Sequence, residues 1–280
     1  MNPPTSPRHR RAPTIGLAAC ALFVFFVGHA GTAAAGGRSA LTTTPRTVPA
    51  ASPAAALASS THAGYSLGLR AIPTTISASG QFVVPALSQC SPTTSGIAFW
   101  AGEATGAGES ALGGAYIDGS MVEAQCLNGA PAYEALIEIQ KTYTQLPVTV
   151  SAGDHVSVSV ATTASTPPDG AITVTFADTT KGYSDTMTGT NTSFSCPKNL
   201  PCQVTLGAAP LQNSASEELP IPTFSTVAFS HALLDGVTPA TAPSTELRRF
   251  NLVNTGNLTQ IATGKLNGAG NGFHEVFKHS

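Results

Sequence analysis

The stretch Asp154-His155-Val156-Ser157-Val158-Ser159-Val160-Ala161-Thr162 indicates the fold class of this chain. Valines alternate with polar residues along it, which places the valines on one face of a half-buried β-strand. Thr166-Pro167-Pro168-Asp169-Gly170 then supplies turn residues, and Ile172, Val174 and Phe176 resume the alternation. The two runs predict neighbouring strands joined as in a hairpin.

Similar short apolar runs recur along the chain. They are Gln81 to Leu87, Ile97 to Ala101, Ala132 to Gln140, Phe224 to Ser230, Leu247 to Val253, Leu258 to Leu266 and Phe273 to Phe277. Only 10% of the 280 residues are charged and 42% are hydrophobic, which suits many short strands. About ten strands separated by turns, with no convincing helix, predict an all-β sandwich of two antiparallel sheets.

The charges are unevenly distributed. Five of the 13 basic residues precede residue 60, whereas all 15 acidic residues follow residue 100. From residue 61 onward, eight basic residues oppose 15 acidic ones, a net charge of −7. Because a nucleic-acid binder needs a basic surface to replace the counterions of phosphate, the sequence excludes that class.

The N-terminal residues 1–35 have the pattern of a signal peptide. Arg8, Arg10 and Arg11 precede the apolar stretch Ile15 to Gly28, and Ala33-Ala34-Ala35 offers a small-residue cleavage site. The apolar stretch has 14 residues, short of the about 20 that span a bilayer. We therefore expect export. The alternative is that the N-terminal segment is retained as an anchor, and we expect membrane attachment only in that case.

Residues 36–60 are rich in Ala, Thr and Pro and have no apolar periodicity, so they form a linker or a pro-segment. The β-sandwich is expected over residues 61–280. A secreted or cell-surface location follows from the signal peptide, and we expect a monomer.

Four cysteines follow the linker: Cys90, Cys126, Cys196 and Cys202. An even number in an exported chain predicts two disulfides. Four cysteines allow three pairings, of which Cys90 with Cys126 and Cys196 with Cys202 is the simplest. No pair has the short spacing of a zinc site, so neither a metal nor a cofactor is expected.

Several short motifs follow one another in an order that resembles a known family. They are Ser79-Gly80-Gln81-Phe82-Val83-Val84-Pro85, Phe99-Trp100-Ala101-Gly102, Tyr133-x-Ala135-x-x-Glu138, Val150-Ser151-Ala152-Gly153-Asp154, Thr175-x-x-Asp178-Thr179-Thr180-x-Gly182 and Phe224-x-Thr226-Val227-x-Phe229. The chain resembles the eqolisin-type glutamic peptidases, as a bacterial member. The resemblance implies a concanavalin A-like, jelly-roll sandwich whose concave face binds an extended peptide.

The family's chemistry uses one Glu as a general base toward water and one Gln that stabilises the oxyanion. The family Gln position falls near Leu112 and Gly113, and no Gln occurs between Gln89 and Gln125. The family Glu position falls near Gln203, which cannot act as a carboxylate base. We therefore expect a catalytically silent homologue of these peptidases.

The resemblance and the strand pattern suggest which residues line the groove: His62, which stands where the family has Trp, and Tyr65, Trp100, Glu134, Leu136 and Glu138. Glu134 and Glu138 share one strand face, roughly 13 Å apart, which is too far for a glycosidase pair. A solvated strand face is the alternative for the two acids, and a core position is the alternative for Trp100.

Three function classes remain open. The leading one is a silent homologue that binds an extended peptide, an unfolded protein or another polymer. The second is a working acid endopeptidase in which Glu134, Glu138 or the region of Gln203 takes part in a rebuilt site. A Gln and a Glu that face each other on the concave sheet would favour it. The third is a structural cell-surface sandwich without a peptide-wide groove.

Histidines invite a hydrolase triad, but no G-x-S-x-G motif places a nucleophile beside them. We expect His62, His155, His231 and His274 to be structural or exposed.

Overall fold

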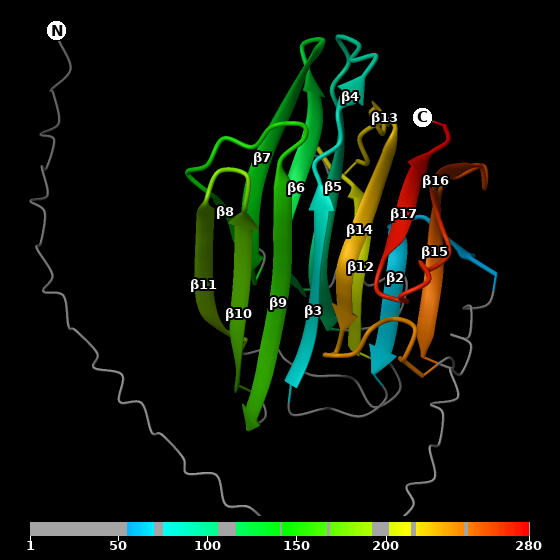
Figure 1. Ribbon diagram of the computed structural model, residues 1–280. Helices are drawn as coiled ribbons and strands as arrows, with labels where there is room; N and C mark the ends of the chain where they lie inside the picture. Colours follow the sequence, from blue (N-terminus) through cyan, green and yellow to red (C-terminus); the bar gives the residue numbers. More distant parts are fainter. Residues whose placement is uncertain are drawn as a thin grey trace, which may run out of the picture. The chain divides into compact units, whose positions relative to one another are not determined.

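The computed structural model describes residues 55–69, 75–105, 116–140, 142–166, 169–191, 202–213, 217–243 and 246–279. The signal-peptide prediction, most of the linker, Leu112, Gly113 and Cys196 lie outside these residues. The described residues form 17 strands and no helix, which confirms the all-β prediction (Figure 1).

The strands follow one hydrogen-bonded path that folds back on itself to make two layers. One layer, called the β9 sheet here, has the order β11 (Tyr183–Asn191), β10 (Asp169–Asp178), β9 (His155–Thr166), β3 (Thr75–Val83), β14 (Thr226–Leu234), β17 (Phe273–Phe277) and β16 (Thr259–Thr263).

The other layer, called the β5 sheet, has the order β15 (Leu247–Val253), β2 (Ala63–Leu69), β12 (Cys202–Pro210), β5 (Ser95–Thr105), β6 (Tyr116–Leu127), β7 (Ala130–Ile139) and β8 (Thr142–Gln145). Pairing of β15 with β16 joins the two layers. Two short pairs complete the fold: β1 (Leu57–Ser59) lies parallel to β15, and β4 (Leu87–Ser88) pairs with β13 (Thr223–Phe224).

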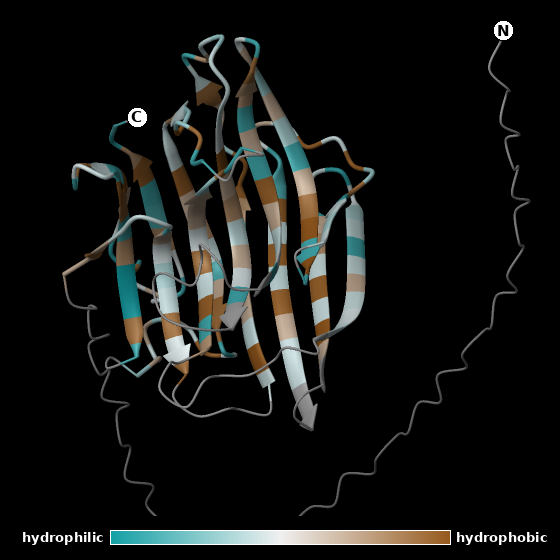
Figure 2. Cartoon of the chain, turned by 180° about the vertical axis from the view of Figure 1, so that it is seen from behind, coloured by the Kyte–Doolittle hydropathy of each residue, from teal (hydrophilic) through white to brown (hydrophobic). Residues whose placement is uncertain are grey.

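The core lies between the layers, because each strand turns alternate side chains inward. Figure 2 shows the resulting bands of hydrophobic and hydrophilic residues along the strands. The predicted hairpin of β9 and β10 is confirmed, with Val160 opposite Val174 and Val158 opposite Phe176, all buried. Stacked rings of Phe229 and Phe273, with centroids 4.8 Å apart, extend the same core.

One predicted disulfide is confirmed: Cys90 is bonded to Cys126 at the end of β6, with a Cα–Cα distance of 5.2 Å. Cys202 is also disulfide-bonded. Its predicted partner, Cys196, lies outside the described residues, so the second pairing stays a prediction. Among the described residues, no helix has the length and apolarity needed to cross a membrane.

Candidate functional site

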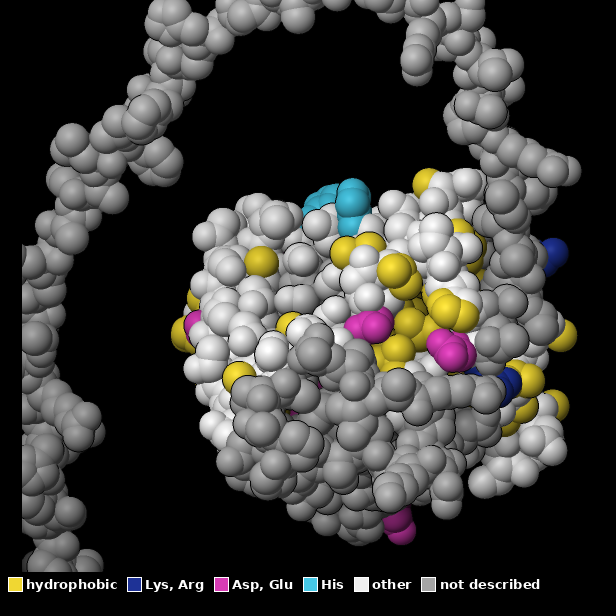
Figure 3. All heavy atoms as spheres, turned by 90° about the horizontal axis from the view of Figure 1, so that it is seen from below, with side chains coloured by type: hydrophobic (Ala, Val, Ile, Leu, Met, Phe, Trp, Pro, Cys, Tyr) yellow, Lys and Arg dark blue, Asp and Glu magenta, His cyan; other side chains and the backbone are white. Residues whose placement is uncertain are grey.

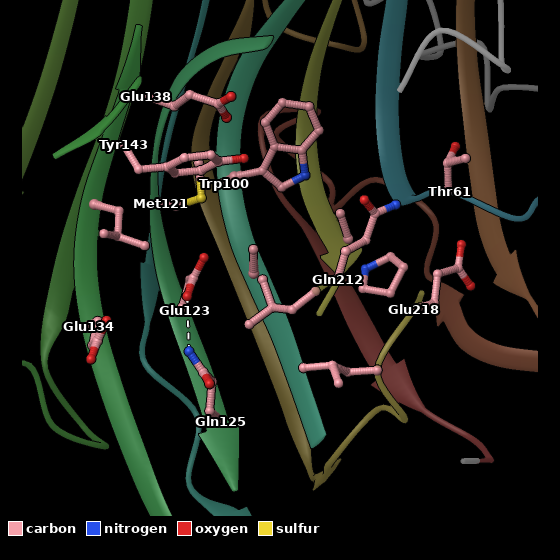
Figure 4. A pocket seen from close by; sticks show the side chains of 16 residues that line it. Thr61, Trp100, Met121, Glu123, Gln125, Glu134, Glu138, Tyr143, Gln212 and Glu218 are labelled. Atoms are coloured by element: carbon pink, nitrogen blue, oxygen red, sulfur yellow. Dashed lines mark hydrogen bonds between the residues drawn. The ribbon is translucent and has the colours of Figure 1, made fainter. Parts of the chain in front are cut away.

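The outer face of the β5 sheet carries a groove with a volume of about 530 Å³ (Figure 4). Strands β5, β6 and β7 supply its floor, because the same alternation that turns Phe99 and Val122 inward turns their neighbours outward. Four outward residues form a small apolar cluster, with Ala209 and Leu211 packed beside it. They are Ala98, Trp100, Met121 and Leu136.

The indole of Trp100 lies across Gly102, two residues further along β5. A Cβ atom at Gly102 would lie 1.8 Å from the indole ring, so only glycine leaves room for this side chain. Trp100 is 3% exposed, and its Nε1 donor is buried with no hydrogen-bond partner among the described residues. The floor of the groove therefore presents an aromatic ring with an unused donor.

A Glu–Gln pair lies on the β6 side of the groove. Gln125 Nε2 donates a hydrogen bond of 2.9 Å to Glu123 Oε2. Glu134 on β7 is the register partner of Glu123. Burial and then the charge of Glu134 raise the pKa of Glu123, although the Gln125 hydrogen bond partly offsets them. This wall therefore carries two carboxyl groups and one amide in close succession.

Glu138 and Tyr143 lie further along the groove, as Figure 4 shows. Glu138 is only 4% exposed. Burial, together with the charge and hydrogen bond of Glu138, raises the pKa of Tyr143, so its hydroxyl stays protonated. Thr61, Gln212 and Glu218 form the opposite wall.

The structure places four of the suggested groove residues along the groove: Trp100, Glu134, Leu136 and Glu138. It does not place His62 and Tyr65 there, since both are fully buried. Tyr65 lies within the core, where its hydroxyl donates a 3.1 Å hydrogen bond to the carbonyl of Gly264.

His62 packs on the ring of Phe250, with centroids 4.5 Å apart. Its Nε2 lies 3.2 Å from Ser66 Oγ, and its Nδ1 lies 3.2 Å from Ser59 Oγ. Burial lowers the pKa of His62 to about 4, so it is neutral at physiological pH. Ser66 is only 1% exposed, which denies a substrate access to this serine–histidine contact. The cluster is structural, as the sequence suggested for His62.

Gln203 lies away from the groove. It is the second residue of β12, at the end opposite Ala209 and Pro210. There it pairs with Gly68 and Ala104, and it does not line the groove. The part of β12 that does line the groove is Ala209 and Pro210, which carry neither a carboxyl nor an amide.

Sequence reasoning missed the strand that carries Glu123 and Gln125. The signal is present in residues 121–126, where Val122, Ala124 and Cys126 are inward and Met121, Glu123 and Gln125 are outward. The alternation is weaker than that of the valines of β9, because the outward Met121 is apolar and the inward Ala124 and Cys126 are small.

Other acids lie between the sheets. Glu103, Asp118 and Glu275 are completely buried. Burial, with a smaller effect from the charge of its register partner Asp118, raises the pKa of Glu103 to about 8, although the hydrogen bond from Thr162 partly offsets the rise. Burial likewise raises the pKa of Glu275 to about 8. No group of three or more potential metal ligands occurs among the described residues.

Seen from below, hydrophobic and acidic side chains gather near the middle of the described surface, with Lys and Arg nearer its right-hand edge (Figure 3). The described residues that line the groove include acidic side chains and no Lys or Arg.

The chain matches one known protein family and resembles two solved structures. The family model of the Peptidase A4 family matches residues 60–268. Scytalido-glutamic peptidase, solved with a peptide-based transition-state analogue, is 18% identical with a TM-score of 0.53, over 78% of this chain and 98% of that one. SCP-B, an eqolisin-family member solved with the tripeptide Ala-Ile-His, is 16% identical with a TM-score of 0.51, over 79% and 98%. Among curated proteins, none matches this sequence.

Proposed function

This chain belongs to the Peptidase A4 family, and on that premise we propose that it is an exported, catalytically silent member that binds an extended polypeptide in the groove of the β5 sheet. The groove itself carries the proposal. It combines an apolar floor, an unused Trp100 donor and polar walls, which is the composition expected of a ligand site. Both structural neighbours were solved with peptide-like ligands.

A purely structural sandwich is less well supported. A volume of about 530 Å³ lies within the range of small-ligand and peptide pockets. In addition, the packing around Trp100 leaves its Nε1 without a hydrogen-bond partner among the described residues. A buried donor without a partner is costly, which favours a role for it with a bound ligand.

Two observations support the proposal that the chain does not hydrolyse peptide bonds. The groove-lining part of β12, the strand on which the family Glu is expected, offers Ala209 and Pro210. Gln203, the nearest side chain to the family Glu position in the sequence, is outside the groove. A general base must reach the attacking water to remove its proton, so neither position supplies one.

The experiment is incubation of the full chain with unfolded casein from acidic to neutral pH, with fragments followed by mass spectrometry. We expect binding, seen by co-sedimentation with immobilised casein, and no cleavage. Cleavage at any pH would overturn the silent assignment, and absence of binding would overturn the groove assignment.

A second candidate is acid hydrolysis of peptide bonds, favoured by the contact of Gln125 with Glu123 in the groove. Here Glu123, when ionised, would take a proton from water as it attacks the peptide carbonyl, and the Gln125 amide would donate to the oxyanion. The protonated Glu123 would then give that proton to the peptide nitrogen as the C–N bond breaks, which releases the carboxyl and amine products. If casein is cleaved, Glu123→Gln must abolish cleavage and Glu217→Gln, in an exposed turn, must not. Loss of cleavage in Glu138→Gln instead would assign the base to Glu138.

Export is supported by the disulfide between Cys90 and Cys126, because such bonds persist in oxidising compartments. The mass of the mature N-terminus tests it. A chain that begins after residue 35 would show signal cleavage, whereas a chain that begins at Met1 would show a retained anchor.

A further inference from the structure

Glu123 and Glu134 form an acidic wall beside the apolar floor. They are register partners on neighbouring antiparallel strands, where like charges directly opposite each other repel. Both are half-buried, so solvent screens them incompletely. Among the described residues, no Lys or Arg lines the groove to compensate them. A cation from outside would relieve this repulsion.

Trp100 gives an independent sign of what that ligand contains. Its Nε1 is a buried donor without a partner, and Trp100 is 97% shielded from solvent. In Figure 4 the nitrogen points toward the side of the groove where Gln212 and Thr61 lie. An indole nitrogen only donates, so its partner must be an acceptor such as a carbonyl oxygen.

The floor sets a third requirement. Ala98, Met121 and Leu136 provide an apolar surface between the acidic wall and the β12 side. A free polyamine could pair with the acidic wall, but it has no carbonyl oxygen to accept a hydrogen bond from Trp100. An extended polypeptide satisfies all three features, because it offers carbonyl acceptors, apolar side chains and a cationic side chain at strand spacing.

We propose that the groove selects extended polypeptide segments that carry a lysine or arginine, whose cationic side chain lies against Glu123 and Glu134 while a backbone carbonyl accepts from Trp100. The inference rests on the proposed function, that the groove binds polypeptide, and adds its selectivity. Charge complementarity of this kind fixes which partner binds and in which register.

The test uses the full chain in neutral buffer of low ionic strength, where the wall carboxyls are ionised, and two fluorescein-labelled peptides. One is acetyl-Ala-Leu-Lys-Ala-Leu-Ala-amide, and the other has norleucine in place of lysine. Fluorescence anisotropy measures affinity. Because Trp100 is the sole tryptophan of the chain, its emission, followed with unlabelled peptides, reports binding at the groove floor. We expect the lysine peptide to bind about tenfold more tightly and both to change the emission.

The variant Glu123→Gln/Glu134→Gln should bind the two peptides equally. The matched control Glu217→Gln/Glu246→Gln loses the same net charge outside the groove and should keep the tenfold preference. Circular dichroism of each variant verifies folding, and retained norleucine-peptide binding verifies the groove.

The outcomes separate the two proposals. If neither peptide binds, polypeptide binding itself is wrong. If both bind the unmodified chain equally, polypeptide binding stands and cationic selectivity is wrong. If the lysine preference survives the groove variant, or binding leaves Trp100 emission unchanged, the assigned site is wrong.

Discussion

The sheet region formed by β5, β6 and β7 carries acidic residues on both of its faces, and their surroundings differ between the two faces. Glu103 and Asp118 point between the sheets, where burial raises the pKa of both groups. Glu123 points outward into the groove, where it accepts a hydrogen bond from Gln125 and stays half-exposed. The same residue type is thus a neutral core group on one face and a ligand-facing group on the other.

The difference teaches that strand parity, rather than residue type, decides what an acid does in this fold. Glu103 Oε1 accepts a hydrogen bond from Thr162 on the opposite sheet, but Oε2 has no partner within the part of the chain that the structure describes. Neither Glu103 nor Glu275 pairs with a Lys or Arg within the described residues. A protonated carboxyl tolerates such a site far better than an ionised one.

The largest predicted effect is therefore a loss of stability as pH rises. The pKa values of Glu103 and Glu275 are raised from 4.5 to about 8 in the folded protein. Their full contribution to stability is present below pH 4.5 and is lost as pH rises toward 8. Each group lowers the free energy of unfolding by about 1.4 kcal/mol per pH unit in that window.

Thermal unfolding between these pH limits measures this slope. Glu103→Gln and Glu275→Gln should each flatten it, because glutamine resembles the protonated carboxyl. Glu217→Gln, in an exposed turn, should not. His62 acts in the opposite direction: its pKa is lowered to about 4, so its contribution is lost as pH falls from 6.5 toward 4. A melting temperature that rises from mildly acidic to alkaline pH would refute the role of the buried acids.

The second effect concerns the inward-facing Cys126, on the same strand face as Asp118. Its bond to Cys90 closes a loop of 36 residues, which the chain-entropy model values at roughly 4 kcal/mol. Cys90→Ser/Cys126→Ser should lower the free energy of unfolding by about that amount in urea denaturation. A loss below about 1 kcal/mol would show that β6 is held by packing alone.

Much of the fold was predictable from the sequence because valine-rich strands such as β9 alternate cleanly. The order of short motifs also led to the correct family, although each motif is weak alone. The Asp154 motif is structural: Asp154 accepts hydrogen bonds from the amide of Ser151 and from Lys181 Nζ, which hold the turn before β9.

The candidate site was only partly predictable. The outward parity of Glu134 and Glu138 was evident from the run that begins at Tyr133, but the strand of Glu123 was not recognised. Its alternation is weak, because outward Met121 is apolar and inward Ala124 and Cys126 are small, and its pairing with β7 is not visible in the local sequence. The burial of His62 also depends on Phe250, nearly 190 residues away along the chain, and no local pattern reveals such a contact.

The third effect tests the outer face. Gly102→Ala places a methyl group where the indole of Trp100 lies, so the ring must leave its position. Overpacking of this kind costs about 1–3 kcal/mol. We expect a red-shifted Trp100 emission, weaker peptide binding and an unchanged pH slope of stability. Gly268→Ala, with open space around its Cα, is the matched control. An unchanged emission spectrum would place the indole elsewhere.

The smallest effect concerns the two acids of the outer wall. Glu134→Gln removes the charge opposite Glu123, so the pKa of Glu123 should fall; it should stay above its ordinary value because burial, the larger cause, remains. Stability should change by about 0.5 kcal/mol or less, as for other half-exposed substitutions. Carbon-detected NMR titration of the Glu123 carboxyl measures the shift. The same substitution at Glu217 should leave the titration of Glu123 where it was. If Glu134→Gln also leaves the pKa of Glu123 unchanged, the two side chains do not interact across β6 and β7. The outer wall would then hold two independent acids, and the proposed contrast with the neutral acids of the inner face would be wrong for the outer face.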